Sequence, residues 1–257
     1  MIPAVPPRAA VEALFEHGRV DPADTALVSV VVSLHNYARF LPACLDSVAA
    51  QTHAALELVI VDDASDGDDG ARVAAAWLAQ HAGRFAHSTL LRHVRNQGVA
   101  ETRNTGFAHA HGAAVFVLDA DNMIYPRAIA RLHDVLHRQM FDAAYTQLEF
   151  FDAGQRLGYA DVWHRDGFLH ENFVDAMALV RRRAWHLVGG YTPIEGGWED
   201  YDFWCKFIDH GLTAAYVPEI LCRYRVHERS MLHTEHRGRR QSLAVQLTLR
   251  HPWLRVQ

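Results

Sequence analysis

Short apolar runs alternate along the chain with segments in which apolar residues recur every three to four positions. Short, β-branched apolar runs are typical of buried strands in a parallel sheet, and the periodic segments are typical of amphipathic helices. Strands are predicted at residues 27–34, 56–61, 89–91 and 113–118. Helices are predicted between them, at residues 36–51, 68–80 and 100–111. This alternation implies right-handed crossovers and a ligand site at the carboxyl ends of the strands.

The pattern is looser outside this core. Further elements are predicted as a helix at 8–18, an extended segment at 143–151, a helix at 199–210, a strand at 219–222 and a helix at 238–249. No repeat or low-complexity linker divides the chain, so we predict one α/β domain over residues 1–257, with a mostly parallel, Rossmann-like sheet flanked by helices. Its parts are a first half at about 27–122, a second half at about 123–230 and a helical tail at 231–257.

Composition narrows the classes of partner and compartment. A chain of 257 residues with 50% hydrophobic residues can bury the core of such a domain. The net charge of −5 and the scattered basic residues argue against a nucleic-acid partner. Three widely spaced cysteines and 18 histidines without compact ligand spacing indicate neither a disulfide framework nor a zinc cluster, and most histidines are expected on the surface.

The sequence also bears on location. It contains no signal-peptide pattern and no apolar stretch approaching the roughly 18 residues that span a bilayer. We therefore expect a cytoplasmic protein, with at most peripheral contact at the inner face of the membrane.

Paired acids follow the predicted strand at 56–61. Asp62 and Asp63 stand where a strand ends and a small-residue turn begins. Carboxylates in this place can accept hydrogen bonds from a nucleobase imide or from ribose hydroxyls. The alternative is that these acids only turn the chain and cap the next helix, and the pattern by itself leaves both interpretations open.

A second acidic pair follows the strand at 113–118. Asp119 and Asp121 form an Asp-x-Asp pattern in a turn, where both carboxylates can converge on one ligand. Carboxylate oxygens hold hard divalent cations, and such a cation offsets the negative charge of a departing nucleotide diphosphate. The alternative is a solvated turn, because the pattern is short and common by chance.

A third acidic pair opens the predicted helix at 199–210. Gly196 and Gly197 precede Glu199 and Asp200, and glycines allow the backbone to approach a ligand closely. One of these acids can serve as a general base toward an acceptor hydroxyl. The alternative is stabilisation of the helix amino terminus by negative charge.

Two arginines and one histidine complete the candidate residues. Arg103, on the helix at 100–111, can point at a donor site or brace the acidic strand ends. Arg225 can counter pyrophosphate charge, and His227 can supply a third metal ligand through its neutral imidazole. A lone histidine is more often a surface or core residue.

Taken in order, these segments resemble the family 2 glycosyltransferases with the GT-A fold, over roughly residues 27 to 230. The matching segments are residues 28–37, 61–65, 96–106, 119–121, 189–191, 199–200 and 224–227. Each is weak alone, and their common order makes the resemblance specific. The first half of the chain is then the nucleotide-sugar-binding half, and the second half is the acceptor side.

The resemblance implies roles for particular residues. Leu34 and Asn36 would cradle the base, and Asp62 or Asp63 would read a uracil or its equivalent. The metal, Mn²⁺ or Mg²⁺, would be held by Asp121, with Asp119 on the metal or the ribose and His227 completing the site. Asp200 would be the base of a single inverting displacement, beside Glu199. The residues expected to bind the nucleotide sugar are Leu34, Asn36, Asp62, Asp63, Arg103, Asp119 and Arg225. Those expected to bind the metal are Asp119, Asp121 and His227, and those expected to act in catalysis are Asp200 and Glu199.

Further implications are a UDP-sugar donor, a glycan or other hydroxyl acceptor, and a part in cell-surface polysaccharide or glycoconjugate synthesis. The sequence departs from the commonest family pattern at Ser33-Leu34-His35, where Pro-Thr-Tyr is usual, and at Ala64, where Gly is usual. The base contacts are most affected by these differences.

Two other functions would use similar residues. A sugar-phosphate nucleotidylyltransferase would need a Gly-rich phosphate loop with a basic residue near Leu34, which this sequence lacks. A non-catalytic nucleotide-sugar or glycan-binding protein would use the acids only to hold its ligand. Asp200 adds nothing evident to donor binding, so its substitution distinguishes an enzyme from a binding protein.

Overall fold

A computed structural model describes residues 10–227 and 239–256. One sheet runs through the molecule in the order β1-β4-β3-β2-β5-β9-β7-β10-β6, and β8 pairs with β7 off this path. The strands are β1 (Val11–Gly18), β2 (Val28–Leu34), β3 (Leu56–Asp62), β4 (His87–His93), β5 (Ala114–Asp119), β6 (Met123–Ile124), β7 (Ala143–Asp152), β8 (Arg156–Leu157), β9 (Ala178–Arg181) and β10 (Ala214–Val226).

The four strands predicted in the first half of the chain are parallel, as expected. Strands β4, β3, β2 and β5 are neighbours in that order and run in one direction. Every residue of β2 and β3 is buried, which explains why their apolar runs are continuous rather than alternating. In the second half β7 and β10 are parallel, whereas β9 is antiparallel to both β5 and β7 and joins the two halves.

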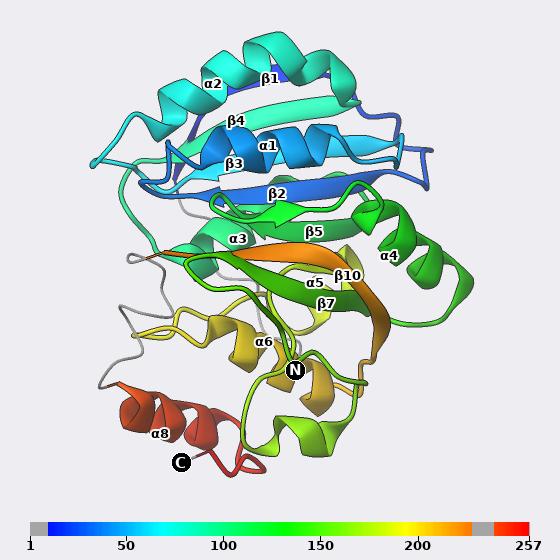
Figure 1. Ribbon diagram of the computed structural model, residues 1–257, viewed down its shortest axis with the longest axis vertical. Coiled ribbons are helices and arrows are strands. Elements are labelled where there is room, and N and C mark those ends of the chain that lie inside the picture. The colour runs from blue at the N-terminus through cyan, green and yellow to red at the C-terminus, as the bar shows by residue number, and fades with distance from the viewer. Residues whose placement is uncertain (1–9, 228–238, 257) are drawn as a thin grey trace.

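Helices cover both faces of the sheet (Figure 1). They are α1 (Leu41–Ala49), α2 (Gly70–His81), α3 (Val99–His109), α4 (Ala128–Arg138), α5 (Arg182–Leu187), α6 (Glu199–Asp209) and α8 (Arg240–Arg250). One core lies between the sheet and α1, α2 and α4, and includes Val30 and Val32 of β2. The intervening Val31 belongs to a second core with α3, α5, α6 and α8. Successive side chains of β2 point to opposite faces of the sheet and therefore pack into two different hydrophobic cores.

Most predicted elements are confirmed, including the C-terminal helix, which is described from residue 239 onward. The helix predicted at 8–18 is wrong: in its described part the chain forms β1, which pairs antiparallel with β4. Val11 and Phe15 are the partly buried residues of this segment. A spacing of four places two side chains on one face of a helix or of a strand, so it could not separate the two, and pairing with the edge of β4 decided the outcome.

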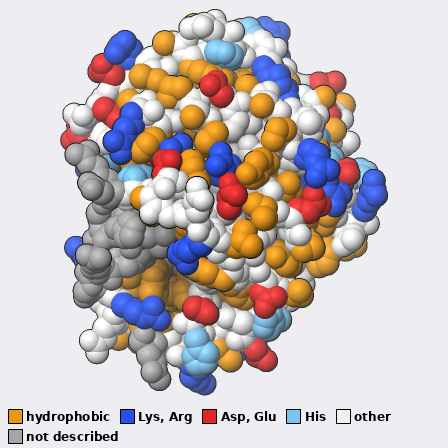
Figure 2. All heavy atoms as spheres, in the orientation of Figure 1, with side chains coloured by type: hydrophobic (Ala, Val, Ile, Leu, Met, Phe, Trp, Pro, Cys, Tyr) orange, Lys and Arg blue, Asp and Glu red, His pale blue; other side chains and the backbone are white. Residues whose placement is uncertain are grey.

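The described ranges give three further findings, which concern helix length, surface charge and the histidines. None of their helices combines the length and the apolar character needed to cross a membrane. On the face drawn in Figure 2, basic and acidic side chains are interspersed, without an extended basic patch among the described residues. Among the described histidines, His87, His93, His227 and His251 are buried, and the others are partly or fully exposed, in line with the expectation that most lie at the surface.

Candidate active site

The predicted acids lie at one edge of the sheet. Leu34 at the end of β2 is in register with Asp62 of β3, and Ser33 is in register with Asp119 of β5. Parallel strands bring their carboxyl ends together, so residues far apart in the sequence meet here. Parallel pairing thus brings Asp119 and Asp62, each at the end of its own strand, to the same edge of the sheet.

Two cavities open at this edge and share part of their lining. The strand-end cavity, of about 720 Å³, is lined by Ser33, Leu34, Asp63, Asp119 and Asp121, among others. The Asp200 cavity, of about 430 Å³, is lined by Asp200, Asn172, Asp175, Tyr159 and Trp198, among others. Asp119, Gly197, Glu199 and Tyr224 line both. Asp119 and Asp121, two of the three candidate metal residues, therefore face a space that adjoins the one lined by the candidate base, whereas His227 lines neither cavity.

Asp121 and His227 approach each other in the way a metal site requires. The His227 Nε2 atom lies 3.1 Å from Asp121 Oδ2, and both side chains are about nine-tenths buried. Burial and the neighbouring Asp119 raise the pKa of Asp121 to about 7. Carboxylate and imidazole groups are the ligand types of a hard or borderline divalent cation. The residue types thus fit the metal that the resemblance implies. Asp121 and His227 are in contact, whereas Asp119, which pairs with Arg103, does not bring a ligand atom within 4.8 Å of both.

Arg103 braces the acids rather than lying free in the cavity. Its guanidinium donates to Asp119 at 3.1 and 3.2 Å and to Glu199 at 3.0 Å. Burial works against its charge, but Asp119 and Glu199 raise the pKa of Arg103 well above its usual range. Of the two roles considered for Arg103, the geometry matches the bracing role. It also gives Glu199 a partner, which leaves Asp200 as the better-placed base.

Asp200 is oriented from two directions. Its Oδ2 atom accepts a hydrogen bond from Asn172 Nδ2 at 3.0 Å, and its Oδ1 atom accepts one from the Tyr201 backbone N–H at 2.8 Å. Burial and the charge of Glu199 raise the pKa of Asp200 to about 7. A carboxylate with a pKa near the working pH is suited to general base catalysis.

The backbone before α6 explains how Asp200 reaches its cavity. Gly196 and Gly197 have φ values of +98° and +105°, and Trp198 follows in the left-handed region at +66°. Such conformations favour glycine because it lacks a Cβ atom. The tight turn places Glu199 and Asp200 in the first turn of α6.

The carboxylates of Asp62 and Asp63 are both engaged within the protein. Asp62 accepts hydrogen bonds from Ser65 and lies 3.0 Å from an Arg92 guanidinium nitrogen. Asp63 accepts the backbone N–H groups of Gln97 and Gly98, both at 2.8 Å, and also contacts His93. Only Asp63 lines the strand-end cavity. The structure thus gives Asp63 a structural task, shaping the loop before α3, besides any contact with a base.

Asn36 and Leu34 occupy different surroundings. Asn36, with φ of +58°, uses its side-chain oxygen to accept the backbone N–H groups of Asp66 and Gly67 at 3.0 and 2.8 Å. It joins the loop after β2 to the loop after β3 and does not appear in the lining of either cavity, whereas Leu34 lines the strand-end cavity. Asparagine tolerates this left-handed conformation better than most residues.

Arg225 lies behind the Asp121 turn. Its Nε atom donates to the Asp121 carbonyl at 2.7 Å, its backbone N–H donates to Asn122, and its guanidinium pairs with Asp152. It also packs over the Phe40 ring. Arg225 therefore supports the turn that carries Asp121, and neither cavity has it among its lining residues.

Three residues of the site were not found from the sequence. Asn172 orients Asp200, and Asp175 lines the same cavity with its pKa raised by burial to about 6. The Ser33 hydroxyl lines the strand-end cavity and is buried without a hydrogen-bond partner in the described chain. Asn172 and Asp175 belong to an irregular segment without a recognisable spacing. Ser33 stood out only as a departure from the family pattern.

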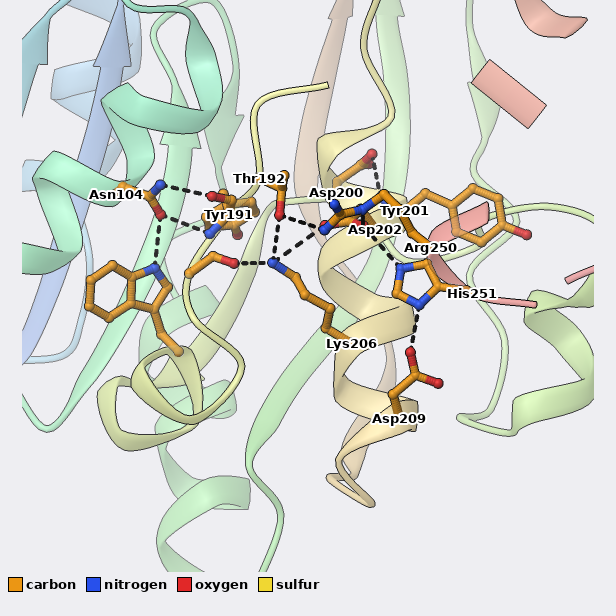
Figure 3. Close-up of polar contacts among 12 residues, drawn as sticks. Asn104, Tyr191, Thr192, Asp200, Tyr201, Asp202, Lys206, Asp209, Arg250 and His251 are labelled. Carbon is orange, nitrogen blue, oxygen red and sulfur yellow. Dashed lines mark hydrogen bonds and ion pairs between the residues drawn. The ribbon is translucent and has the colours of Figure 1, made fainter. Parts of the chain in front are cut away.

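A polar network holds α6 against α8 (Figure 3). The fully buried Asp202 carboxylate accepts from Arg250 Nε at 2.5 Å, lies 3.0 Å from His251 Nε2 and lies 3.3 Å from Lys206 Nζ. Although burial acts in the opposite direction, the hydrogen bond from His251 and the charges of Lys206 and Arg250 hold the pKa of Asp202 well below its usual range. This network fixes the helix that carries Asp200.

Asp202→Asn should lower the free energy of unfolding at pH 7 by about 3–5 kcal/mol, because it leaves the buried Lys206 ammonium, and with it the partly exposed Arg250 guanidinium, without a counter-charge. A group whose pKa is depressed on folding stabilises the protein above its unfolded pKa, and this contribution is lost as the pH falls. The difference in the free energy of unfolding between variant and parent, measured by urea unfolding, should therefore become smaller below about pH 4. The exposed Asp134, which has only a 3.8 Å contact with Arg138, provides the control Asp134→Asn. Equal losses in the two variants would contradict this role for Asp202.

Comparison with known proteins agrees with this geometry. The model of glycosyl transferase family 2 matches residues 29–188, more than half of the chain. The succinoglycan biosynthesis protein ExoU of Rhizobium meliloti is 34% identical over 128 residues, which is 50% of this chain and 35% of ExoU. The chain thus spans about a third of that relative's length.

Solved structures show the same fold. The S. aureus TarS 1-349 structure in complex with UDP-GlcNAc has a TM-score of 0.71 at 13% identity, covering 86% of this chain and 65% of that one. The mannosyltransferase PcManGT of Pyrobaculum calidifontis, in complex with GDP-Man and Mn²⁺, has a TM-score of 0.67 at 22% identity, covering 91% and 66%. The fold is that of the GT-A proteins. The chain belongs to glycosyl transferase family 2.

Proposed function

We propose that this protein transfers a sugar, with inversion, from a nucleotide diphosphate donor to an acceptor hydroxyl, with Asp200 as the general base. The observation that carries the proposal is the place of Asp200. Its carboxylate lines a cavity that adjoins the strand-end cavity across Asp119 and Glu199. Because its pKa is raised to about 7, it can take a proton from an acceptor near neutral pH.

The donor would occupy the strand-end cavity, with its pyrophosphate near Asp119 and Asp121. Mn²⁺ or Mg²⁺ bound by Asp119, Asp121 and His227 would offset the pyrophosphate charge as the glycosyl bond breaks. The unpartnered Ser33 hydroxyl and the side chain of Leu34 are available to the nucleoside. Arg103 keeps Asp119 and Glu199 at fixed positions, which supports alignment of donor and acceptor.

The acceptor would lie in the Asp200 cavity. Tyr159 and Trp198 offer aromatic surface there, and Asn172 keeps the base oriented. Aromatic rings suit the apolar faces of sugars, which favours a glycan acceptor. A UDP-sugar donor and a part in polysaccharide or glycoconjugate synthesis are consistent with TarS binding UDP-GlcNAc and with ExoU taking part in succinoglycan biosynthesis.

The first test is ligand-dependent thermal stability. A ligand that binds the native state raises the melting temperature by mass action. We expect one nucleotide diphosphate, UDP first, to stabilise the protein in Mn²⁺ or Mg²⁺ and not in chelator, and the matching nucleotide sugars then become candidate donors. Equal stabilisation with and without metal would count against the metal site, and no shift with any nucleotide would count against the donor.

The pH dependence of transfer tests the assigned base. With a pKa of about 7, Asp200 is ionised above that pH and protonated below it, so kcat/KM should rise with pH and level off above about 7. Asp121 has a raised pKa as well, but excess Mn²⁺ competes with its proton and should move only that part of the profile. Initial rates at several Mn²⁺ concentrations separate the two groups. A flat profile between about pH 5 and pH 8 would contradict both assignments.

A further inference from the structure

A second cluster of ligand-type side chains lies at the edge of the sheet opposite the candidate active site. Glu57 is near the start of β3, His87 begins β4, and His111 follows α3 just before β5. The amino ends of these parallel strands meet there, while Asp62 and Asp119 mark the carboxyl ends of β3 and β5. The cluster is therefore separate from the acids assigned to the sugar donor.

The three side chains converge on one point. Glu57 Oε1 lies 2.9 Å from His87 Nδ1 and 2.6 Å from His111 Nδ1. One ligand atom from each residue lies within 4.8 Å of the other two, and this is the one such group of three in the described ranges. The Glu57 side chain is fully buried and that of His87 is 8% exposed, whereas that of His111 is 54% exposed. The cluster thus has a rigid inner part and one member at the surface.

The surroundings orient these ligands. The second carboxylate oxygen of Glu57 accepts hydrogen bonds from the Ser29 hydroxyl and the His111 backbone N–H, which directs Oε1 toward the histidines. On the far side of its ring, His87 Nε2 lies 3.4 Å from Glu16 Oε1. Metal-binding histidines commonly donate their other ring N–H to a carboxylate, which turns the lone pair of the first nitrogen toward the metal. Glu16 stands in that place for His87.

We propose that Glu57, His87 and His111 bind one Zn²⁺ ion. Two imidazole nitrogens and one carboxylate oxygen suit zinc better than Mg²⁺ or Mn²⁺, which prefer oxygen ligands. Zinc–ligand bonds of about 2.0–2.1 Å place neighbouring ligand atoms roughly 3.4 Å apart in tetrahedral geometry. The distance from Glu57 to His87 must therefore increase by about 0.5 Å, and the distance from Glu57 to His111 by about 0.8 Å. The exposed His111 side chain can make the larger movement, whereas the smaller one requires a shift of the buried Glu57 or His87 side chain. The exposed side of His111 leaves room for water as a fourth ligand.

The bound ion would tie three segments together. Glu57 and His87 lie on adjacent strands, and His111 belongs to the connection between α3 and β5. A metal that binds only the folded arrangement stabilises it. We expect the role of this ion to be structural, because neither cavity of the candidate active site includes any of its three ligands.

The test is zinc binding to the whole protein in excess Mg²⁺, by isothermal titration calorimetry and by metal analysis after dialysis. An Asp121→Asn background removes the acid at the other metal site. We expect one equivalent of Zn²⁺ and a raised melting temperature. His111→Ala should weaken binding at least about tenfold and abolish the thermal shift. Because His111 is exposed, this variant should fold, and circular dichroism checks that it does.

The matched control is His137→Ala. His137 stacks on His133 of α4, which in turn lies against His53, so these three histidines are the main competing place for zinc. The control should bind zinc as the parent does. Binding lost in His137→Ala but retained in His111→Ala would overturn the proposal, as would a parent protein that binds no zinc and holds Glu57 by hydrogen bonds alone.

Discussion

Asp200→Asn should lower kcat for sugar transfer by about three orders of magnitude, within the range of general base catalysis, and leave donor affinity largely unchanged. The amide keeps the size of the side chain and can still contact Asn172, but it cannot accept the proton of the acceptor hydroxyl. Transfer is measured with the donor found in the thermal-stability test, and donor affinity is measured separately by calorimetry. This separation distinguishes an enzyme from a binding protein, in which the acid would only hold ligand.

A control for Asp200 lies on the same helix. Asp209 contacts His251 and the Trp253 indole at the far end of α6, outside both cavities. Asp209→Asn should therefore preserve most of the transfer activity. If Asp200→Asn retained parental activity, Asp200 would not be the base, and Glu199 or Asp175 would have to be tested in its place.

Asp121→Ala should abolish the metal-dependent part of nucleotide binding. Asp121 is the more deeply buried acid of the pair, and burial together with the neighbouring Asp119 raises its pKa, so a bound cation would stabilise the ionised carboxylate. The measurement is nucleotide affinity with Mn²⁺ and with chelator, for parent and variant. In the parent the two affinities should differ by at least about tenfold, and in the variant they should coincide.

An exposed acid gives the comparison for Asp121→Ala. Asp69 lies just before α2, where its exposed side chain pairs with Arg72 and lines neither cavity, so Asp69→Ala should keep the parental response to Mn²⁺. A parent protein with the same nucleotide affinity in Mn²⁺ and in chelator would refute a metal at Asp121.

The sequence was most informative where burial is strongest. Continuous apolar runs predicted β2, β3 and β5. Because these strands are parallel, the acids at their carboxyl ends could also be placed at one edge of the sheet. The sequence was least informative at the short strand β9, whose four residues carry no boundary signal of their own. The edge strand β1 depends on contacts with β4, so its local spacing resembled that of a helix.

The site shows the same limit. Motif spacing indicated Asp121, His227 and Asp200, because each follows a strand or opens a helix, and their roles stay predictions. It could not show that Asp63 holds the loop before α3, or that Asn172 orients Asp200, since both depend on residues distant in the sequence. Tertiary contacts decide whether a polar side chain binds a ligand or another part of the protein, and these contacts cannot be derived from a single sequence.

Arg103 pairs with one acid from each half of the chain, which matters when segments are exchanged between related proteins. The family match ends at residue 188, so Glu199 and Asp200 come from beyond the matched region, yet Glu199 shares one guanidinium with Asp119. A chimaera that joins residues 1–188 of this chain to the second half of another protein keeps Arg103 and Asp119 and depends on the new half for the second carboxylate. Leaving half of a buried ion pair unmatched is costly. Functional chimaeras should therefore require an acid at the Glu199 position, whatever acceptor the new half recognises.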